Sequence, residues 1–191
     1  MVDKDGIHTT TDKVRAVQRF PVPTTVNNVR SFLGLAGYYR AFIQDFAAIS
    51  APLTRLLKKN VPFQWNDAQQ RSFEFLKASL THAPILAFPD YDLPFIICTD
   101  ASTKGIGAVL MQQVEPRKPH VIAYASRTLN AAESHYSITH LEMLAVVWSL
   151  RHFRDIIYGY DITVYTDHTA VTQLFKGKKP LGSASQMVSH Y

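Results

Sequence analysis

The sequence is poor in cysteine and has no long apolar segment. Cys98 is the one cysteine among 191 residues, which excludes an internal disulfide and a zinc site built from cysteines. No uninterrupted apolar run approaches the ~20 residues that a membrane-spanning helix needs. The residues after Met1 are polar and then basic, without the apolar core of a secretory signal. We therefore expect an intracellular protein that does not enter a membrane.

Apolar and charged residues make up 47% and 18% of the chain, which are the proportions of a folded protein. The length leaves room for one compact domain or two small ones, and not for a complete multidomain polymerase.

The positive charge is concentrated in the first half. Residues 1–89 carry 11 Lys and Arg against 6 Asp and Glu, whereas residues 90–191 carry 9 of each. A basic half beside a neutral half suggests a surface for a polyanion joined to a module with another task. An ordinary soluble surface that happens to be basic is the alternative.

The first half predicts helices. Apolar residues recur at helical spacing through residues 26–42. A second helix is expected to begin at Pro52, because proline suits the first turn of a helix, and a third is expected to follow Asn66. We therefore expect residues 24–80 to form a small three-helix unit.

The second half predicts strands around a long helix. The expected elements are strands at 93–99, 106–111 and 120–127, a helix at 137–158, a strand at 161–166 and a short helix at 169–175. Two hairpins make the first three strands antiparallel, and the long helix crosses over so that the fourth strand runs parallel to the first. The fold class is therefore α+β or α/β, with a helical segment followed by a mixed sheet.

Three acidic residues are expected to meet at one edge of this sheet. Asp100 ends the first strand, Asp167 ends the fourth, and Glu142 lies within about two turns of the start of the long helix. If the two strands are neighbours, ~4.8 Å apart, the three carboxylates come together at the carboxyl ends of parallel strands. Open α/β sheets place their sites at such ends.

Clustered carboxylates repel one another, so their convergence makes sense with cations present. Oxygen ligands without histidine or cysteine favour Mg²⁺ or Mn²⁺ over zinc. Two such ions can activate water and stabilise the leaving oxygen in phosphodiester hydrolysis. The alternative is that each acid is an ordinary residue of a strand end or a first helical turn.

Several segments, in one order along the chain, resemble the ribonuclease H domain of gypsy-type long-terminal-repeat retrotransposon polyproteins. They are 99–102 (TDAS), 105–110 (GIGAVL), 123–130 (AYASRTLN), 142–147 (EMLAVV) and 165–168 (YTDH). The upstream segments 30–43 (RSFLGLAGYYRAFI), 52–54 (PLT) and 63–65 (FQW) resemble the thumb of the reverse transcriptase that precedes that domain.

The resemblance implies a two-metal nuclease that cleaves the RNA strand of an RNA–DNA hybrid. Asp100, Glu142 and Asp167 match the first three metal-binding acids of the family, with Mg²⁺ or Mn²⁺ as the cofactor. Ser102 and Arg127 are expected to contact the sugar-phosphate backbone. A hybrid is recognised by its shape, its phosphates and the RNA 2′-hydroxyl, so we expect no base-specific contacts.

Two basic residues of the helical half are further candidates for nucleic-acid contacts. Gly34 and Gly37 can let the helix approach a duplex minor groove, with Arg30 and Arg40 on phosphates. Close packing between helices explains the same glycines equally well.

The resemblance also predicts a division of the chain. Residues 1–89 are expected to hold the end of the reverse-transcriptase palm and a thumb-like segment, 90–179 a ribonuclease H-like domain, and 180–191 a divergent polar tail. The terminal strand, the last helix and the fourth metal-binding acid of the family are expected to be missing, since no Asp or Glu follows Asp167. We therefore expect a weak nuclease, unless the rest of a polyprotein or a second chain completes the sheet.

Other functions remain open at this stage. A catalytically inactive nucleic-acid-binding remnant of a retrotransposon would have the same motifs. The paired acids of polymerisation are absent, because no two acidic residues are adjacent in the sequence. An actin-like ATP-binding domain also begins with a strand that ends in Asp, but it is built from two copies of the fold, and the sequence has no internal repeat.

Overall fold

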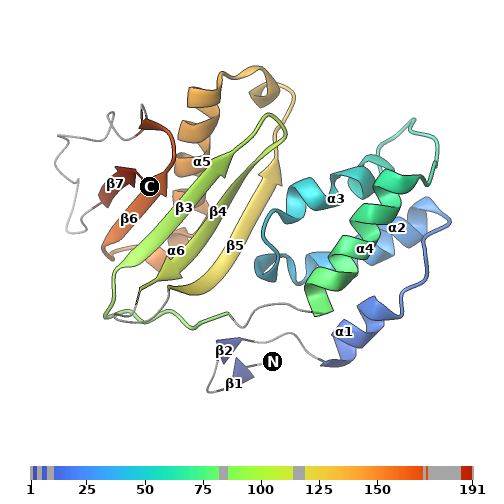
Figure 1. Cartoon of the computed structure of the whole chain (residues 1–191), viewed down its shortest axis with the longest axis horizontal. Helices are drawn as coiled ribbons and strands as arrows, with labels where there is room; N and C mark the ends of the chain where they lie inside the picture. Colours follow the sequence, from blue (N-terminus) through green and yellow to red (C-terminus); the bar gives the residue numbers. More distant parts are fainter. Residues whose placement is uncertain are drawn as a thin grey trace.

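The computed structural model describes residues 2–3, 6–7, 11–81, 86–113, 119–169, 171 and 186–190. A group of helices and a twisted sheet lie side by side, with one long helix against the sheet (Figure 1). No helix among the described residues is both long enough and apolar enough to cross a membrane.

The first half is helical, as the apolar spacing predicts. A short hairpin of β1 (Val2–Asp3) and β2 (Gly6–Ile7) precedes the helices α1 (Thr11–Gln18), α2 (Val26–Gly37), η1 (Arg40–Phe42), α3 (Phe46–Arg55) and α4 (Asp67–Thr81). The Thr25 hydroxyl accepts a hydrogen bond from the Asn28 amide and caps α2. The Gln69 side chain accepts from the Asn66 amide before α4, which completes half of a capping box.

Two helix boundaries differ from the prediction. The first predicted helix ends at Gly37, and the 3₁₀ turn η1 follows it. The second helix, α3, begins at Phe46 and contains Pro52 in its interior. Phe46 and Leu53 pack into the same apolar cluster, so burial of the apolar face extends the helix upstream of the proline.

Aromatic and aliphatic side chains from these helices form one core. Phe32 of α2 and Phe73 of α4 lie with ring centroids 4.6 Å apart, and both are almost fully buried. Leu53, Leu76 and Leu80 complete the centre of this cluster. Burying side chains of this size contributes roughly 1.5–3 kcal/mol each.

The second half forms the mixed sheet that the sequence predicts. Its elements are β3 (Phe95–Ala101), β4 (Gly105–Gln112), β5 (His120–Thr128), η2 (Glu133–His135), α5 (Ile138–His152), α6 (Arg154–Ile157), β6 (Ile162–Thr166) and β7 (Gln186–His190). The strand order is β5-β4-β3-β6-β7. Strands β3, β4 and β5 pair antiparallel, and β6 pairs parallel with β3.

The fifth strand corrects one expectation. Strand β7 pairs parallel with β6, from Ile162 opposite Gln186 to Thr166 opposite His190, so the edge of β6 is not left open. The polar sequence of this tail concealed the strand because pairing at a sheet edge uses main-chain groups, which every residue other than proline supplies in full. Most of the short helix expected at 169–175 lies outside the described residues.

The long predicted helix is divided into α5 and α6. The Ser137 hydroxyl accepts a hydrogen bond from the His140 amide and caps α5. Val146 of α5 packs with Phe95, Ile97 and Val164 of the sheet in a second core. Figure 1 shows α5 running along the sheet, with α6 at its end, and the helices α1 to α4 beyond β5.

The helical segment and the sheet meet at β5. The amide of Ala47, in the first turn of α3, donates to the Ser126 hydroxyl at 3.0 Å. Val121 and Tyr124 of β5 pack against the core of the helices. The amide of Ala87 also donates to the carbonyl of Val121, at 2.8 Å. Helix α3 and the sheet edge are therefore fixed relative to each other.

A glycine substitution tests the close packing of β4 on β5. A Cβ at Gly105 would lie 2.7 Å from the Arg127 carbonyl oxygen, so we expect Gly105→Ala to lower the free energy of unfolding by about 1–3 kcal/mol. Gly34→Ala is the control. It adds a methyl in open space on a helix, and we expect it to raise stability by about 0.5–1 kcal/mol. Urea unfolding measures both. Equal stability of the two variants would contradict the strand geometry.

Candidate functional site

The three predicted acids lie at one edge of the sheet. Parallel pairing of β3 with β6 places Cys98 opposite Tyr165. Two residues further along, Asp100 is still in β3 and pairs with Gly107 of β4, and Asp167 directly follows the end of β6 on the neighbouring strand. Both are exposed. Glu142 reaches the same edge from α5 and is only 3% exposed.

The pKa of the Glu142 carboxyl is shifted well above its ordinary value. Burial and the negative charges of Asp167 and Asp100 together raise its pKa to about 7, against the opposing effect of hydrogen bonds from the Ala101 amide and the Thr166 hydroxyl. Its Oε2 atom is buried without a hydrogen-bond partner among the described residues. A buried carboxylate close to two exposed ones, with an oxygen that has no hydrogen-bond partner among the described residues, destabilises the folded protein. A cation nearby would make the same arrangement favourable.

The donor chemistry fits a hard divalent cation. All three side chains offer oxygen, which Mg²⁺ and Mn²⁺ prefer. Within the described part of the chain, however, no three His, Cys, Asp or Glu side chains are grouped closely enough to hold a metal ion. The acids share an electrostatic environment, and the exposed side chains of Asp100 and Asp167 would have to turn to complete a coordination sphere.

A fourth acid, Asp45, lies near Asp100, and sequence reasoning missed it. It precedes α3 in the left-handed conformation, with φ 55°, and its side chain makes no capping hydrogen bond. Burial and the charge of Asp100 both raise its pKa. In the sequence, Asp45 stands directly before an apolar helical segment, a position that is typical of a helix N-cap and does not by itself indicate a site.

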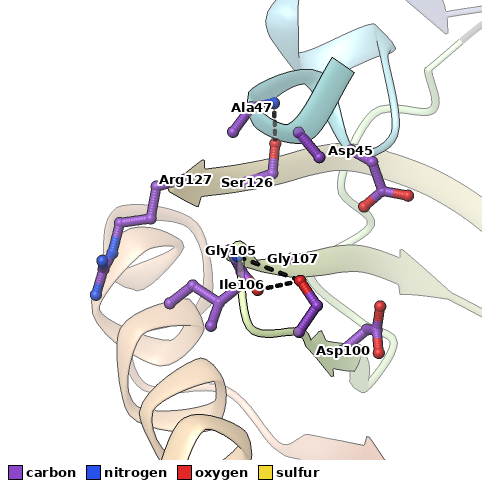
Figure 2. Close-up of a pocket in the computed structure, with 10 residues that line it drawn as sticks. Asp45, Ala47, Asp100, Gly105, Ile106, Gly107, Ser126 and Arg127 are labelled. Carbon is purple, nitrogen blue, oxygen red and sulfur yellow. Dashed lines mark hydrogen bonds between the residues drawn. The ribbon is translucent and has the colours of Figure 1, made fainter. Parts of the chain in front are cut away.

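Asp45 and Asp100 line a pocket between the start of α3 and the sheet. The pocket has a volume of about 200 Å³ and is also lined by Ser102, Ser126 and Arg127. A neighbouring pocket of about 110 Å³ shares Asp45 and Asp100. Figure 2 shows both carboxylates on the same side of the first pocket, while the Arg127 side chain lies at the other end and is turned away from them.

Gly107 makes room for this approach. A Cβ at this position of β4 would lie 3.2 Å from Asp45 Oδ1, which is closer than almost all such contacts. The glycine in the GIGAVL segment therefore permits the Asp45 carboxylate to lie over the sheet.

The structure places Ser102 in the turn between β3 and β4. Its hydroxyl accepts from the amides of Lys104 and Gly105 and is 3.2 Å from the Gly105 carbonyl. These contacts shape the turn. The residue is exposed and lines the pocket beside Asp100, and its contact with a sugar-phosphate backbone stays a prediction.

Arg127 is engaged by a neighbouring acid. Its two terminal nitrogens donate to the Glu133 carboxylate at 2.7 and 2.9 Å, and its guanidinium lies 5.8 Å from the centre of the Trp148 ring. The pair lowers the pKa of Glu133. This bidentate contact ties the end of β5 to the approach to α5, so Arg127 has a structural role that the sequence did not indicate.

Arg30 and Arg40 are exposed on the helical segment. Arg30 donates to the Asn27 side chain at 2.7 Å in the same helix. The charge of Arg40 helps to lower the pKa of His152, after burial, so η1 lies near the end of α5. Neither arginine lines the two pockets beside Asp100.

The sheet order and the acids at the ends of β3 and β6 define a ribonuclease H-like domain. Residues 65–164 match the family described as the RNase H-like domain found in reverse transcriptase. The chain belongs to this family.

Relatives agree with this assignment. The Pol polyprotein of transposon gypsy from Drosophila melanogaster is 42% identical over 185 residues, which cover 90% of this chain and 17% of that protein. The Pol polyprotein of transposon 412 from the same organism is 43% identical over 92% of this chain and 14% of its own length. The Gag-Pol polyprotein of gibbon ape leukemia virus is 36% identical over 80% of this chain and 9% of its own. The chain thus spans less than a fifth of each of these relatives.

Solved structures confirm the fold. The foamy viral protease-reverse transcriptase in complex with an RNA/DNA hybrid matches with a TM-score of 0.78 and 21% identity, over 98% of this chain and 28% of that chain. The same protein in complex with double-stranded DNA matches with the same score, over 98% of this chain and 43% of that chain. The match therefore includes both the helices and the sheet.

The pKa of Glu142 predicts how stability depends on pH. The folded protein keeps the Glu142 proton up to pH of about 7, whereas the unfolded chain releases it near 4.5. The folded state therefore holds more protons in this interval, and its stability falls as pH rises from about 4.5 to 7, by up to about 3 kcal/mol. Urea unfolding in metal-free buffer between pH 4.5 and 8 should show this loss in the wild type and not in Glu142→Gln. Parallel pH profiles for the two proteins would contradict it.

Proposed function

We propose that the chain is a divalent-metal-dependent ribonuclease that hydrolyses the RNA strand of an RNA–DNA hybrid. The observation that carries this proposal is the buried Glu142 carboxyl, which has one oxygen without a hydrogen-bond partner among the described residues and lies close enough to Asp100 and Asp167 for their charges to raise its pKa. Its place at the carboxyl ends of β3 and β6 in a ribonuclease H-like domain supports the same role. Domains of this family generally use divalent metals, and Mg²⁺ or Mn²⁺ suits three carboxylates.

Asp100, Glu142 and Asp167 would hold the metal ions. When bound, two such ions activate the attacking water and stabilise the leaving oxygen of the phosphodiester. The protein groups set the charge and the position of the site. Thr166 and the Ala101 amide orient the Glu142 carboxyl, and burial keeps its free oxygen away from bulk water.

The proposed substrate follows from charge and from the structural neighbours. The excess of positive charge lies in residues 1–89, which contain all the helices from α1 to α4. Neighbours with the same fold have been solved with double-stranded DNA and with an RNA/DNA hybrid. In this proposal the hybrid lies across the helical segment and the edge of the sheet that carries Asp100, Glu142 and Asp167. Arg30 and Arg40 contact phosphates, and Ser102 lies near the strand that is cleaved.

The relatives suggest the setting in which the chain acts. Because they are polyproteins of which this chain spans a small part, we propose that it works inside the cell as part of a larger reverse transcriptase. Residues 1–89 would form the end of the palm and the thumb-like segment, and the ribonuclease H-like domain would follow. Polymerisation is not part of the proposal, since the sequence contains no adjacent acidic pair.

One observation favours a second function. The described residues offer no ready group of three metal-binding side chains. A domain that keeps the fold and the basic surface while its acids stay apart would bind hybrids without cleaving them. The alternative is therefore a catalytically inactive nucleic-acid-binding remnant of a retrotransposon.

Substitution of the two arginines tests the placement of the hybrid. Each lost phosphate contact reduces the slope of log affinity against log salt concentration by about 1, so the Arg30→Gln, Arg40→Gln double variant should reduce it by about 2. Arg154→Gln, in the half without net charge, is the control and should leave the slope unchanged. Fluorescence anisotropy with a labelled hybrid between 50 and 200 mM salt measures both. An unchanged slope in the double variant would remove the helical segment from the interface.

A cleavage assay separates the two functions. We expect slow cleavage of a labelled RNA strand in a hybrid at millimolar Mg²⁺ or Mn²⁺, because a misplacement of ~1 Å at such a site costs roughly a hundredfold in rate. Asp100→Asn should abolish this activity while hybrid affinity is retained. Binding without metal-dependent cleavage, equal in wild type and Asp100→Asn, would establish the inactive remnant instead.

A further inference from the structure

His168 directly follows Asp167 and is turned toward α5. Its Nε2 atom lies 3.3 Å from the hydroxyl of Thr139, in a contact between partly buried side chains. Thr139 belongs to the first turn of α5, three residues before Glu142, so the two side chains lie on the same face of the helix. The histidine ring therefore joins the turn that carries Asp167 to the helix that carries Glu142.

A second connection runs through Thr166, on the other side of Asp167. The Thr166 side chain is fully buried, and its hydroxyl accepts a hydrogen bond from the His168 amide at 3.3 Å. The same hydroxyl hydrogen-bonds to the Glu142 carboxyl. Asp167 thus lies in the sequence between two residues that each contact a side chain of α5, Thr166 with Glu142 and His168 with Thr139.

The position of the histidine ring leaves one of its nitrogens without a hydrogen bond to any described residue. Its Nδ1 atom is buried and has no hydrogen-bond partner among the described residues. A buried polar atom without a partner opposes folding, so an apolar side chain would suit this place better if packing were its only task. The use of an imidazole indicates that the contact from Nε2 to Thr139 matters for the site.

We propose that His168 is a positioning residue, which fixes the Asp167 carboxylate relative to Glu142 through its contact with Thr139. The proposal rests on the proposed ribonuclease function and adds to it two residues that touch neither metal nor substrate. Asp167 is exposed and follows the end of β6, so the pairing of β6 alone does not fix its side chain. Loss of a group that orients a metal ligand typically costs 10–100-fold in metal affinity or activity.

Three variants isolate the contact. His168→Ala removes the ring, Thr139→Val removes only the hydroxyl at nearly constant volume, and His168→Gln keeps a polar group that can reach Thr139. His120→Ala removes an exposed histidine at the start of β5 and is the control. The double variant of His168→Ala and Thr139→Val tests whether the two side chains act through one contact.

Two measurements on the full chain test whether these variants disorder the turn and weaken metal binding. Hydrogen exchange in metal-free protein reports the order of residues 166–169. Cleavage of a labelled hybrid over a range of Mg²⁺ concentrations reports the metal requirement, kcat and KM. We expect faster exchange at 166–169 and an about 10-fold or greater rise in the half-saturating Mg²⁺ concentration for His168→Ala and Thr139→Val. The KM for the hybrid should stay unchanged, the double variant should be no worse than either single one, and His168→Gln should recover most of the loss.

The possible failures are distinguishable. Unchanged exchange at 166–169 and an unchanged Mg²⁺ requirement in His168→Ala would overturn the positioning role while the nuclease stands. A general loss of protection across β3 and β6 together with a lowered Tm would also overturn it, because the residue would then be structural. If the wild type does not cleave, the proposed function fails, and the exchange data still test the contact. Local loss of protection at 166–169 in both Thr139→Val and His168→Ala, but not in His168→Gln or His120→Ala, would show that the contact orders the turn, and its absence would overturn the positioning role.

Discussion

The parallel pairing of β3 with β6 is the constraint on which the site depends. Parallel neighbours need a crossover connection, and here it is supplied by α5, which packs on the sheet through Val146. The pairing brings Asp100 and Asp167 to adjacent strand ends although 67 positions separate them along the chain. The crossover then returns Glu142 to the same edge. One backbone interaction therefore assembles three carboxylates that have no attraction for one another.

That assembly lowers the stability of the metal-free protein. Burial and two neighbouring negative charges disfavour ionised Glu142, and hydrogen bonds from the Ala101 amide and the Thr166 hydroxyl offset part of this effect. The two apolar cores and the bidentate pair of Arg127 with Glu133 stabilise the fold and offset the stability lost at the site. Unfavourable groups that are held in place by a well-packed frame are typical of functional sites, because the same charges attract a ligand that the unfolded chain cannot bind.

Sequence reasoning reached the mixed sheet and the parallel pairing of its first and fourth strands, because apolar periodicity and the rules for crossover connections are local or topological. The shared metal site of Asp100, Glu142 and Asp167 stays a prediction, since the described residues contain no group of three such side chains close enough to hold a metal ion. Sequence reasoning missed contacts that depend on side-chain direction in three dimensions. The bidentate contact of Arg127 with Glu133, six residues away across a turn, was not foreseen, while its contact with a phosphate stays a prediction. Asp45 comes close to Asp100 only because α3 docks on β5. Strand β7 was missed because its pairing uses the main chain, which a side-chain pattern does not report.

The docking of α3 links the basic half to the acidic edge. The Ala47 amide bonds to Ser126 of β5, so the start of α3 is fixed over the sheet, and Gly107 leaves space there for the Asp45 carboxylate. Burial and the charge of Asp100 raise the pKa of Asp45. When ionised, Asp45 adds negative charge beside Asp100 and so attracts cations to this part of the sheet. The helical segment thus contributes both positive charge that suits a nucleic-acid backbone and one acid that acts on the site electrostatically. The two apolar cores are built mainly from residues on either side of position 89. The charges of the site nevertheless come from both sides, because Asp45 interacts with Asp100.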